Sequence, residues 1–600
     1  MEVLNHRQFY DMLLSGADEI ITNQKELNDI NVFPVADGDT GNNLAHLMNM
    51  IKRESKWSDA STEETLENIK LACMRGSRGN SGMIFSQFII SMCNFLIQHP
   101  EVNVDKFIDM CRESVDSAVN AVSVPKEGTV LTVMKSWAES VQEESAKTQS
   151  IQSILKQSYP NASAALEKTK TQMEVFRIHN VVDAGAKGFL HFLHGLIDAK
   201  PQAVSAQAGS ETDTLLEDAP HVMNESDEIP FRYCSEFLVE LNGNENIQTL
   251  KPDMAEYGDS IVTVGDSGLG KVHLHTNDPA SIAEMLVDKG NIVYQKVEDM
   301  QRQYESIYQR KASIALVVDS ACDIPQEWLD TYQIFMLPLN LEVDQSTYLD
   351  KVTLQSDTFY DKLDASSDQP KSSQPSLMSV ESLYQQLLQQ YDSVLSLHVS
   401  QKLSGTFDVC YKASQAVDPE RIHVINTCTL SGAFGLIAYE AAKAIDQGSS
   451  LAEVKQTVDN FTPKSEILVS VPTLKHMIRG GRVSPLQGKV ARWLNMKPIV
   501  SIDADGNSLL YGKTFFSNSS QWKMFKQVKA IHEKHGVRDY VVLHAGNPEG
   551  AERCEEEIKK ITGTEPLYTT SVSPVIGGNA GKGAISIAML LDEDNLRNEA

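Results

Sequence analysis

Helical spacing of apolar residues dominates the first third of the chain. Ser61 and Glu64 have the spacing of a capping box, in which two side chains satisfy backbone N–H groups at a helix start. Leu66 and Ile69 follow on one face of the helix that this box would begin. Convincing strand patterns are few before residue 200. We therefore predict an all-α domain over residues 1–200.

This pattern is lost directly after the first domain. The segment 202–231 contains no Lys or Arg, and it carries seven acidic residues and two prolines. Such a segment has too little apolar surface to form a core, and its like charges favour a solvated chain. We predict an acidic linker over residues 201–230.

Strand patterns appear after the linker. A helical pattern follows them, and together they predict a small α+β domain over residues 231–310. The strand patterns lie at 236–241, 260–264 and 271–275, and the helical pattern lies at 281–288.

Short apolar runs alternate with amphipathic helical segments in the last half of the chain. The first run, 314–318, ends at Asp319, as a buried strand does where it meets a loop. Alternating strands and helices predict an α/β sheet with binding residues at the carboxyl ends of its strands. We assign this domain to residues 311–600. The further runs lie at 336–343, 394–399, 422–426, 467–471 and 540–544.

Composition narrows the choice of function. The chain has 600 residues, which favours several domains, and a net charge of −28. Such acidity argues against a nucleic-acid or anionic-membrane partner, because phosphate binding needs clustered Lys and Arg. Its eight cysteines are scattered without a CxxC pair, which is typical of reduced thiols. The start lacks a signal-peptide pattern, and the most apolar stretch, 83–97, is interrupted by polar residues. We expect a cytoplasmic protein without stable membrane insertion.

Candidate phosphate and metal chemistry lies at residues 31–43, which read NVFPVADGDTGNN. Asp37 and Asp39 stand two apart and are flanked by glycines. Carboxylate oxygens suit Mg²⁺, and glycines let backbone N–H groups approach phosphate. The alternative is a plain turn, since Asp-Gly-Asp is good turn chemistry.

Three more loops have an anion-binding character. RGSRGNSG at 75–82 directly precedes an apolar helix, and a Gly/Ser-rich loop that opens a helix is a ready anion site. PKEGT at 125–129 and VDAGAKG at 182–188 are similar. Each loop is equally compatible with a plain connection between helices. The chain has neither a GxxxxGK[ST] loop nor a protein-kinase glycine loop, so any ATP site is of another type.

A possible zinc site lies in the small α+β domain. His273 and His275 are two apart on a predicted strand, so their side chains face the same side. Together with Cys234 they would form a three-ligand set with an open fourth position, which is typical of catalytic zinc. The alternative is a core cysteine and a half-exposed strand face.

The loops of the first domain carry a resemblance to a known family. NVFPVADGDTGNN, RGSRGNSG, PKEGTVLTV and VVDAGAKGFL occur in this order and resemble the DhaL-type nucleotide-binding domain of dihydroxyacetone kinases, and still more its version in bacterial fatty acid kinase. The resemblance implies a helical barrel that binds ATP through two Mg²⁺ ions. It makes Asp37 and Asp39 catalytic metal ligands. The nucleotide-binding residues that it implies are Asn31, Thr40, Gly41, Asn42, Asn80, Ser81, Gly82, Thr129, Asp183 and Gly185.

The α+β domain resembles the middle domain of fatty acid kinase in YCSEF, GDSIVTVGD and KVHLHTNDP. In that family the matching Cys and two His bind zinc and support activity. The resemblance therefore implies that Cys234, His273 and His275 bind Zn²⁺, and that both histidines are important for catalysis.

Residues 311–595 resemble the DegV family of fatty-acid-binding proteins in VVDS, SSQPS, SQKLSGT, IRGGRVS and SPVIG. Members enclose an acyl chain between two α/β subdomains. The resemblance implies that a fatty acid is held at Ser372, Ser373, Ser404, Gly405 and Asn579.

Two positions depart from the DegV pattern. The family usually has Thr at Ser372, a change that keeps the hydroxyl, and His at Asn579. Asn donates a hydrogen bond but carries no positive charge. Lys582, where the family commonly has Pro, is a candidate source of charge.

These resemblances predict a fused fatty acid kinase. ATP would phosphorylate a fatty acid held in the third domain and give an acyl phosphate. One alternative is a lipid-binding regulator that senses nucleotide without catalysis, and another is a kinase for a small dihydroxyacetone-like acceptor. As partners we expect a fatty acid, a downstream acyltransferase and a second copy of the chain in a homodimer.

Overall fold

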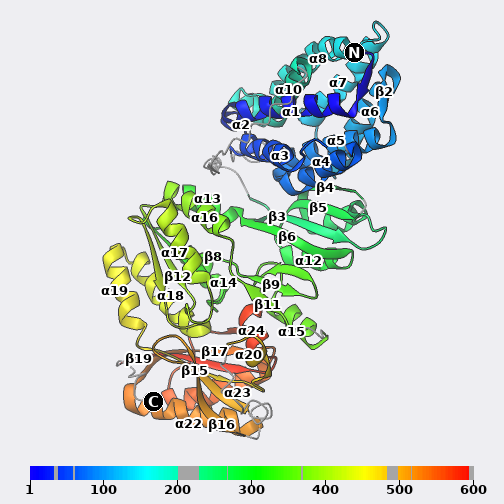
Figure 1. The fold of residues 1–600 in the computed structure, drawn as a ribbon. Coiled ribbons are helices and arrows are strands. Elements are labelled where there is room, and N and C mark those ends of the chain that lie inside the picture. Colours follow the sequence, from blue (N-terminus) through cyan, green and yellow to red (C-terminus); the bar gives the residue numbers. More distant parts are fainter. Residues whose placement is uncertain are drawn as a thin grey trace. The chain divides into compact units, whose positions relative to one another are not determined.

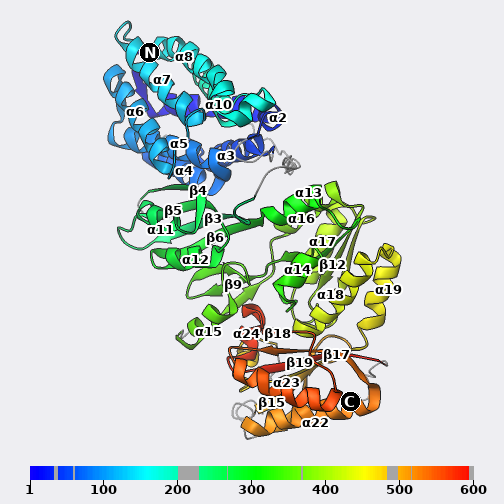
Figure 2. The same ribbon diagram turned by 180° about the vertical axis from the view of Figure 1, so that it is seen from behind.

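The computed structural model describes residues 1–32, 38–58, 61–199, 229–266, 268–365, 369–482, 497–514 and 517–592. The chain divides into two compact units, Met1–Gln301 and Arg302–Ala600, which Figures 1 and 2 show from opposite sides. Asp37 and the predicted linker, except its last two residues, lie outside the described residues.

Helices make up the first part of unit 1, as predicted. Aromatic residues from several helices meet edge to face in one core; Phe88 contacts Trp137, Phe189 and Phe192. The short strands β1 (Val3–Asn5) and β2 (Glu101–Asn103) pair antiparallel. The helices are α1 (His6–Thr22), α2 (Gln24–Asp29), α3 (Thr40–Glu54), α4 (Thr62–Gly76), α5 (Gly79–Gln98), α6 (Val104–Ala121), α7 (Val130–Ser145), α8 (Ile151–Gln172), α9 (Glu174–His179) and α10 (Ala184–Asp198).

Two helices of this part follow from local sequence signals. The Ser61 side chain accepts the backbone N–H of Glu64 at 3.2 Å and caps α4, as the capping-box spacing predicted. Helix α5 is the one helix among the described residues that is long and apolar enough to cross a membrane by length and composition. Most of its side chains are buried in the core of unit 1.

An antiparallel sheet forms the second part of unit 1, with the order β4-β5-β3-β6. Its Leu238, Val262 and Val264 belong to the same hydrophobic core as the helices, so one face of the sheet packs on the helical part. The elements are β3 (Tyr233–Leu241), η1 (Ile247–Leu250), α11 (Lys251–Met254), β4 (Gly258–Asp266), β5 (Leu269–Thr276), α12 (Pro279–Val287) and β6 (Gly290–Asp299).

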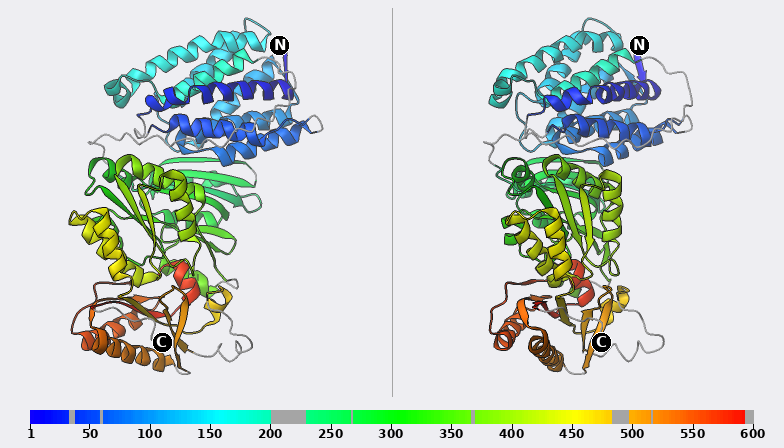
Figure 3. Two further views of the ribbon diagram at one scale, coloured as in Figure 1. Left: turned by 60° about the vertical axis from the view of Figure 1, so that its left-hand side comes forward. Right: turned by 90° about the vertical axis from the view of Figure 1, so that its left-hand side faces the viewer.

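Unit 2 has the predicted α/β architecture. A parallel sheet of order β13-β12-β7-β8 has helices on both faces (Figure 3). Along β7, Leu316 and Val318 pack towards α18 and α19, whereas Ala315 and Val317 pack towards α16 and α17. The elements of this part are β7 (Ile314–Asp319), α14 (Gln326–Thr331), β8 (Phe335–Leu337), α16 (Leu377–Gln390), β12 (Ser393–His398), α17 (Thr406–Val417), β13 (Ile422–Asn426), α18 (Ser431–Asp446) and α19 (Leu451–Phe461).

A second sheet follows, of order β16-β15-β14-β19-β17-β18, and only its β17–β18 pair is parallel. Its elements are β14 (Ser465–Ser470), α20 (Lys475–Arg479), β15 (Lys497–Ile502), β16 (Ser508–Thr514), α22 (Ser517–His535), β17 (Val537–His544), α23 (Pro548–Thr562), β18 (Thr569–Ser571), α24 (Pro574–Ala580) and β19 (Ile585–Leu591).

A small third sheet, β10-β9-β11, completes unit 2. It consists of β9 (Asn340–Val343), β10 (Ser346–Leu349) and β11 (Lys371–Ser373), and α15 (Ser356–Ala365) connects the last two strands. Helix α13 (Met300–Tyr308) contains the boundary between the two units.

Candidate active site

Three of the predicted phosphate loops meet at the N-termini of α5, α7 and α10. A Cβ atom placed on Gly185 would lie 3.0 Å from Ser81 Oγ, 3.4 Å from Asp183 Oδ1 and 3.5 Å from Val130 Cβ. Only a glycine permits this approach without a shift. The loops that carry Ser81, Thr129 and Asp183 are therefore neighbours in space although they are distant in sequence.

Asp183 is the buried carboxyl of this group. Its Oδ1 accepts the backbone N–H of Ala186 at 2.7 Å and so caps α10. Burial raises the pKa of Asp183 to about 6, although hydrogen bonds from the Ala186 and Val130 N–H groups lower this pKa in part. Nearby, Asn80 Oδ1 is buried and has no hydrogen-bond partner among the described residues. Thr129 Oγ1 donates to the Lys126 carbonyl at 2.8 Å.

Asp39 stands at the start of α3, with an Oδ2 that accepts from Asn43 Nδ2 at 2.8 Å. Among the described residues of this motif, Asn31, Thr40 and Asn42 form side-chain hydrogen bonds with one another or with α2. Thr40 Oγ1 donates to Asn31 Oδ1, and Asn42 Oδ1 accepts from Asn28 Nδ2 at 2.8 Å. The side-chain oxygens of Asn31 and Asn42 therefore accept hydrogen bonds within the protein. Among the described residues of the motif, Asp39 is the carboxylate that is placed to bind a cation.

The β4-β5-β3-β6 sheet brings the predicted zinc ligands onto one face. Cys234 lies directly opposite His275 on β5, and His273 lies opposite Glu236, two residues along the same strand as Cys234. Side chains at alternate positions share a face. The ligand atoms of Cys234, His273 and His275 lie within 4.8 Å of one another.

The chemistry of this set fits a cation. Both ring nitrogens of His273 are buried and have no hydrogen-bond partner among the described residues. Burial raises the pKa of the Cys234 thiol well above its usual range, and Glu298, Glu236 and Asp39 raise it further. A bound cation would accept the lone pair of a His273 ring nitrogen that otherwise has no partner. It would also favour the thiolate of Cys234 and so lower the pKa that burial raises.

Four charged residues that the sequence analysis missed lie on the same face. In register, Glu236 and Lys271 share it with the zinc ligands, as do Lys296 and Glu298 of β6. The signal was available, since Glu236 stands two residues after Cys234 and Lys271 two before His273. Lys271 Nζ lies 3.3 Å from Glu236 Oε2, and Lys296 Nζ lies 2.8 Å from Glu298 Oε2.

The same face contacts the phosphate loop of the helical part. Gly79 N–H donates to Glu236 Oε1 at 2.8 Å, and Lys271 Nζ donates to the Ser77 carbonyl. Gly265 N–H of the sheet donates to Gln87 Oε1 on α5 at 3.3 Å. The candidate metal set and the 75–82 loop are therefore parts of one site.

We expect Cys234→Ser to abolish stoichiometric zinc binding, because a hydroxyl replaces the thiolate that zinc prefers. The measurement is the zinc content of the purified chain by elemental analysis. Cys428→Ser is the matched control, since Cys428 is the other cysteine of intermediate burial. An equal zinc content in Cys234→Ser and the unaltered chain would show that Cys234, His273 and His275 do not form a zinc site.

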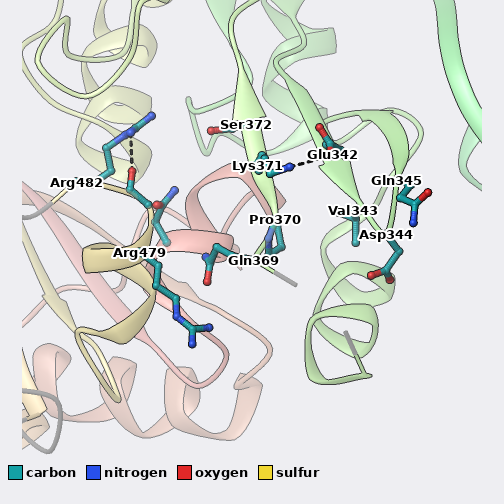
Figure 4. A pocket seen from close by; sticks show the side chains of 12 residues that line it. Glu342, Val343, Asp344, Gln345, Gln369, Pro370, Lys371, Ser372, Arg479 and Arg482 are labelled. Carbon is teal, nitrogen blue, oxygen red and sulfur yellow. Dashed lines mark hydrogen bonds and ion pairs between the residues drawn. The ribbon is translucent and has the colours of Figure 1, made fainter. Parts of the chain in front are cut away.

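Unit 2 contains a cavity of about 660 Å³, shown in Figure 4. Of the predicted fatty-acid residues, Ser372 and Asn579 line it, whereas Ser373, Ser404 and Gly405 do not. Asn579 Nδ2 donates to the Val575 carbonyl at 3.1 Å. The lining residues are Glu342, Val343, Asp344, Gln345, Gln369, Pro370, Lys371, Ser372, Arg479, Gly480, Arg482 and Asn579.

Positive charge in this cavity comes from Arg479 and Arg482, which the sequence analysis did not assign. Arg482 donates to the Gly480 carbonyl at 2.7 Å, and neither arginine forms an ion pair with a carboxylate within the part of the chain that the structure describes. Lys371 is paired with Glu342 at 3.1 Å. Lys582 does not line the cavity and is paired with Asp364 at 2.6 Å.

Comparison with protein-family models separates the chain into three segments. Residues 34–198 match the DAK2 domain, residues 230–307 match the middle domain of FakA-like fatty acid kinase proteins, and residues 313–592 match the DegV family, described as uncharacterised. The chain joins a DAK2 domain, a FakA-like middle domain and a DegV domain. The resemblances found in the sequence are thus confirmed.

Curated relatives match about half of the chain. An uncharacterized protein of Staphylococcus epidermidis is 30% identical over 317 residues, which are 51% of this chain and 57% of that protein. An uncharacterized protein of Staphylococcus aureus is 29% identical over 320 residues, 52% of this chain and 58% of that protein. The matched region therefore spans less than two thirds of these relatives.

Solved structures of DegV proteins match the chain over less than half of its length. DegV of Bacillus subtilis, described as a fatty acid binding protein, is 28% identical, with 47% of this chain and 99% of that chain covered and a TM-score of 0.43. A DegV family protein of Thermus thermophilus, described by its fatty acid binding, is 25% identical, with 46% and 99% covered and a TM-score of 0.43.

Proposed function

We propose that the chain uses ATP to phosphorylate the carboxylate of a fatty acid held in its DegV domain. The observation that carries this proposal is the presence of a DAK2 domain, a FakA-like middle domain and a DegV domain in one polypeptide. One protein then holds both the phosphoryl donor and an acyl acceptor. Because the two domains belong to one chain, the acyl-binding domain is also present at a high effective concentration near the nucleotide-binding domain.

The DAK2 domain would bind the nucleotide. The starts of α5 and α10 lie beside the loops that meet at Gly185, and helix starts of this kind bind phosphate. Asp39, with Asp37, would hold Mg²⁺, which supplies charge neutralisation for the phosphates when bound. Catalysis of this kind rests on positioning and electrostatics more than on covalent chemistry.

The DegV domain would hold the acceptor. A cavity with two arginines suits a carboxylate, because a guanidinium matches its geometry. Ser372 can donate a hydroxyl hydrogen bond to the same group. These arginines offer the positive charge that Asn579 lacks where the DegV family usually has His.

The phosphoryl transfer to the carboxylate needs neither a general acid nor a general base. A carboxylate oxygen of the fatty acid forms a bond to the γ-phosphorus of ATP while the bond from that phosphorus to the bridging oxygen breaks, and ADP leaves. The acceptor is already ionised at neutral pH, so no proton has to be removed from it. The acyl phosphate would then be consumed by an acyltransferase.

Acyl hydroxamate formation tests this proposal. The purified chain is incubated with Mg²⁺, ATP and a long-chain fatty acid, and acyl phosphate is trapped with hydroxylamine. We expect hydroxamate only when ATP and fatty acid are both present, with one ADP formed per hydroxamate. ADP formation with dihydroxyacetone and none with fatty acid would instead identify a small-molecule kinase.

Asn579 favours one other candidate, a lipid-binding regulator that senses nucleotide. This candidate predicts that an acyl chain stays bound to the purified protein, as native mass spectrometry would show, while no hydroxamate forms. In that case Asn579→His should restore hydroxamate formation if the missing imidazole is the cause.

A further inference from the structure

Glu236 occupies a central position on the face of the sheet that packs on the helical part. The residue is buried, at 5% exposure, and its carboxylate contacts groups from two other segments, the 75–82 loop and β5. Oε1 accepts the Gly79 N–H at 2.8 Å and lies 3.5 Å from His273 Nδ1, while Oε2 lies 3.3 Å from Lys271 Nζ. One side chain therefore contacts both a candidate metal ligand and the phosphate loop.

The phosphate loop is held by the sheet at two points. Glu236 accepts from the Gly79 N–H, and Lys271 donates to the Ser77 carbonyl two residues earlier. Gly79 has a φ of 57°, a left-handed conformation that favours glycine. Asn80 and Ser81 follow directly, so the position of Gly79 sets where their side chains and N–H groups point.

His273 gives this contact a dependence on metal. Its Nδ1 lies 3.5 Å from Glu236 Oε1, so Nε2 is the ring nitrogen that would bind a cation while this contact is kept. When a histidine binds a metal through one ring nitrogen, the other becomes an N–H donor, and a carboxylate is its common acceptor. A cation on His273 would therefore fix the Glu236 carboxylate between His273 and Gly79.

We propose that Glu236 is a positioning residue. It couples occupancy of the Cys234–His273–His275 metal site to nucleotide binding at the 75–82 loop. This rests on the proposed function for the identity of the loop's ligand. Coupling of this kind is reciprocal, so zinc and nucleotide each raise the affinity of the other by the same factor. The metal then acts on nucleotide binding without contacting the nucleotide.

Calorimetric titration of the full chain with a non-hydrolysable ATP analogue and Mg²⁺ tests the coupling. We expect the zinc-loaded chain to bind the analogue at least about fivefold more tightly than the chain stripped with a chelator. In Glu236→Gln the two affinities should agree within about twofold, when zinc is saturating. Zinc affinity itself should fall about tenfold in this variant, because the acceptor of the His273 N–H is weakened.

Glu240→Gln is the matched control, since Glu240 lies on the same strand with an exposed side chain. It should keep the zinc dependence of the unaltered chain. Zinc dependence that persists in Glu236→Gln would overturn the proposal, and so would an unaltered chain that binds the analogue equally with and without zinc.

The reciprocal measurement needs no variant and protects the test against misfolding of Glu236→Gln. Zinc affinity of the unaltered chain, measured with a competing chelator, should rise with saturating analogue by the same factor. A factor of one overturns the coupling. Hydroxamate formation is independent of these titrations, so a kinase without coupling and a coupled nucleotide binder without kinase activity are distinguishable.

Discussion

Asp39→Asn is expected to lower ATP turnover at least about a hundredfold. The substitution keeps the shape of the side chain and an oxygen that can accept from Asn43, so the start of α3 should stay intact. What it removes is the negative charge for Mg²⁺, and a metal that stabilises a transferring phosphoryl group contributes several kcal/mol. Each 1.36 kcal/mol corresponds to a factor of about ten in rate.

Steady-state ATP turnover against Mg²⁺ concentration is the measurement. The variant should need more Mg²⁺ for half-maximal rate, which separates loss of metal from loss of fold. Asp109→Ala is a suitable control, because the Asp109 side chain is 47% exposed and pairs with Arg112 at 2.6 Å on α6, a helix that carries none of the metal motif. Turnover unchanged in Asp39→Asn would show that Asp39 does not hold the metal.

The fold class followed from hydrophobic spacing, because the first domain keeps the helical period whereas the third alternates short apolar runs with amphipathic helical segments. Details that depend on tertiary context did not follow. The apolar run 336–343 became two strands, β8 and β9, since Pro338 between them cannot donate a ladder hydrogen bond. Strand β6 was not predicted, because its KVED end has no alternation of apolar and polar residues. The second sheet is mostly antiparallel, and strand period does not encode direction.

The candidate site, like the fold, could be predicted from the sequence only in part. Spacing and resemblance selected Cys234, His273 and His275, and the structure brings their ligand atoms together. The role of Glu236 could not be predicted, because it depends on a contact with Gly79, which is 157 positions away in sequence. The position of Arg479 in the cavity could not be predicted, because a charged residue beside glycines usually lies on a solvated loop.

Asp323→Ala is expected to destabilise unit 2 by about 3 kcal/mol or more. The Asp323 side chain is fully buried and is the centre of a polar network. Oδ1 lies 2.9 Å from Lys351 Nζ and accepts the Ser573 N–H at 3.0 Å, and Oδ2 accepts from Ser431 Oγ at 2.6 Å. Removing one partner of a buried ion pair leaves the other charge uncompensated and costs about 3–5 kcal/mol.

Urea denaturation of the full chain, followed by tryptophan fluorescence, measures this loss. Trp328 stacks on Tyr439 at 4.0 Å and meets Tyr568 edge-on at 5.0 Å, so its emission reports on unit 2. The Tyr568 hydroxyl donates to the Asp323 carbonyl at 2.7 Å, which places the probe beside the substitution.

Asp361→Ala is the matched control for this prediction. Asp361 also pairs with a lysine, Lys582, at 3.4 Å, but its side chain is 85% exposed. Solvent screens an exposed pair, and its contribution is about 0–1 kcal/mol. The same substitution should therefore shift the unfolding midpoint strongly at Asp323 and hardly at Asp361. Equal shifts would mean that burial does not set the strength of these pairs. The bonds from Asp323 to Ser431, at the start of α18, and to Ser573, before α24, would then add no more stability than an exposed ion pair.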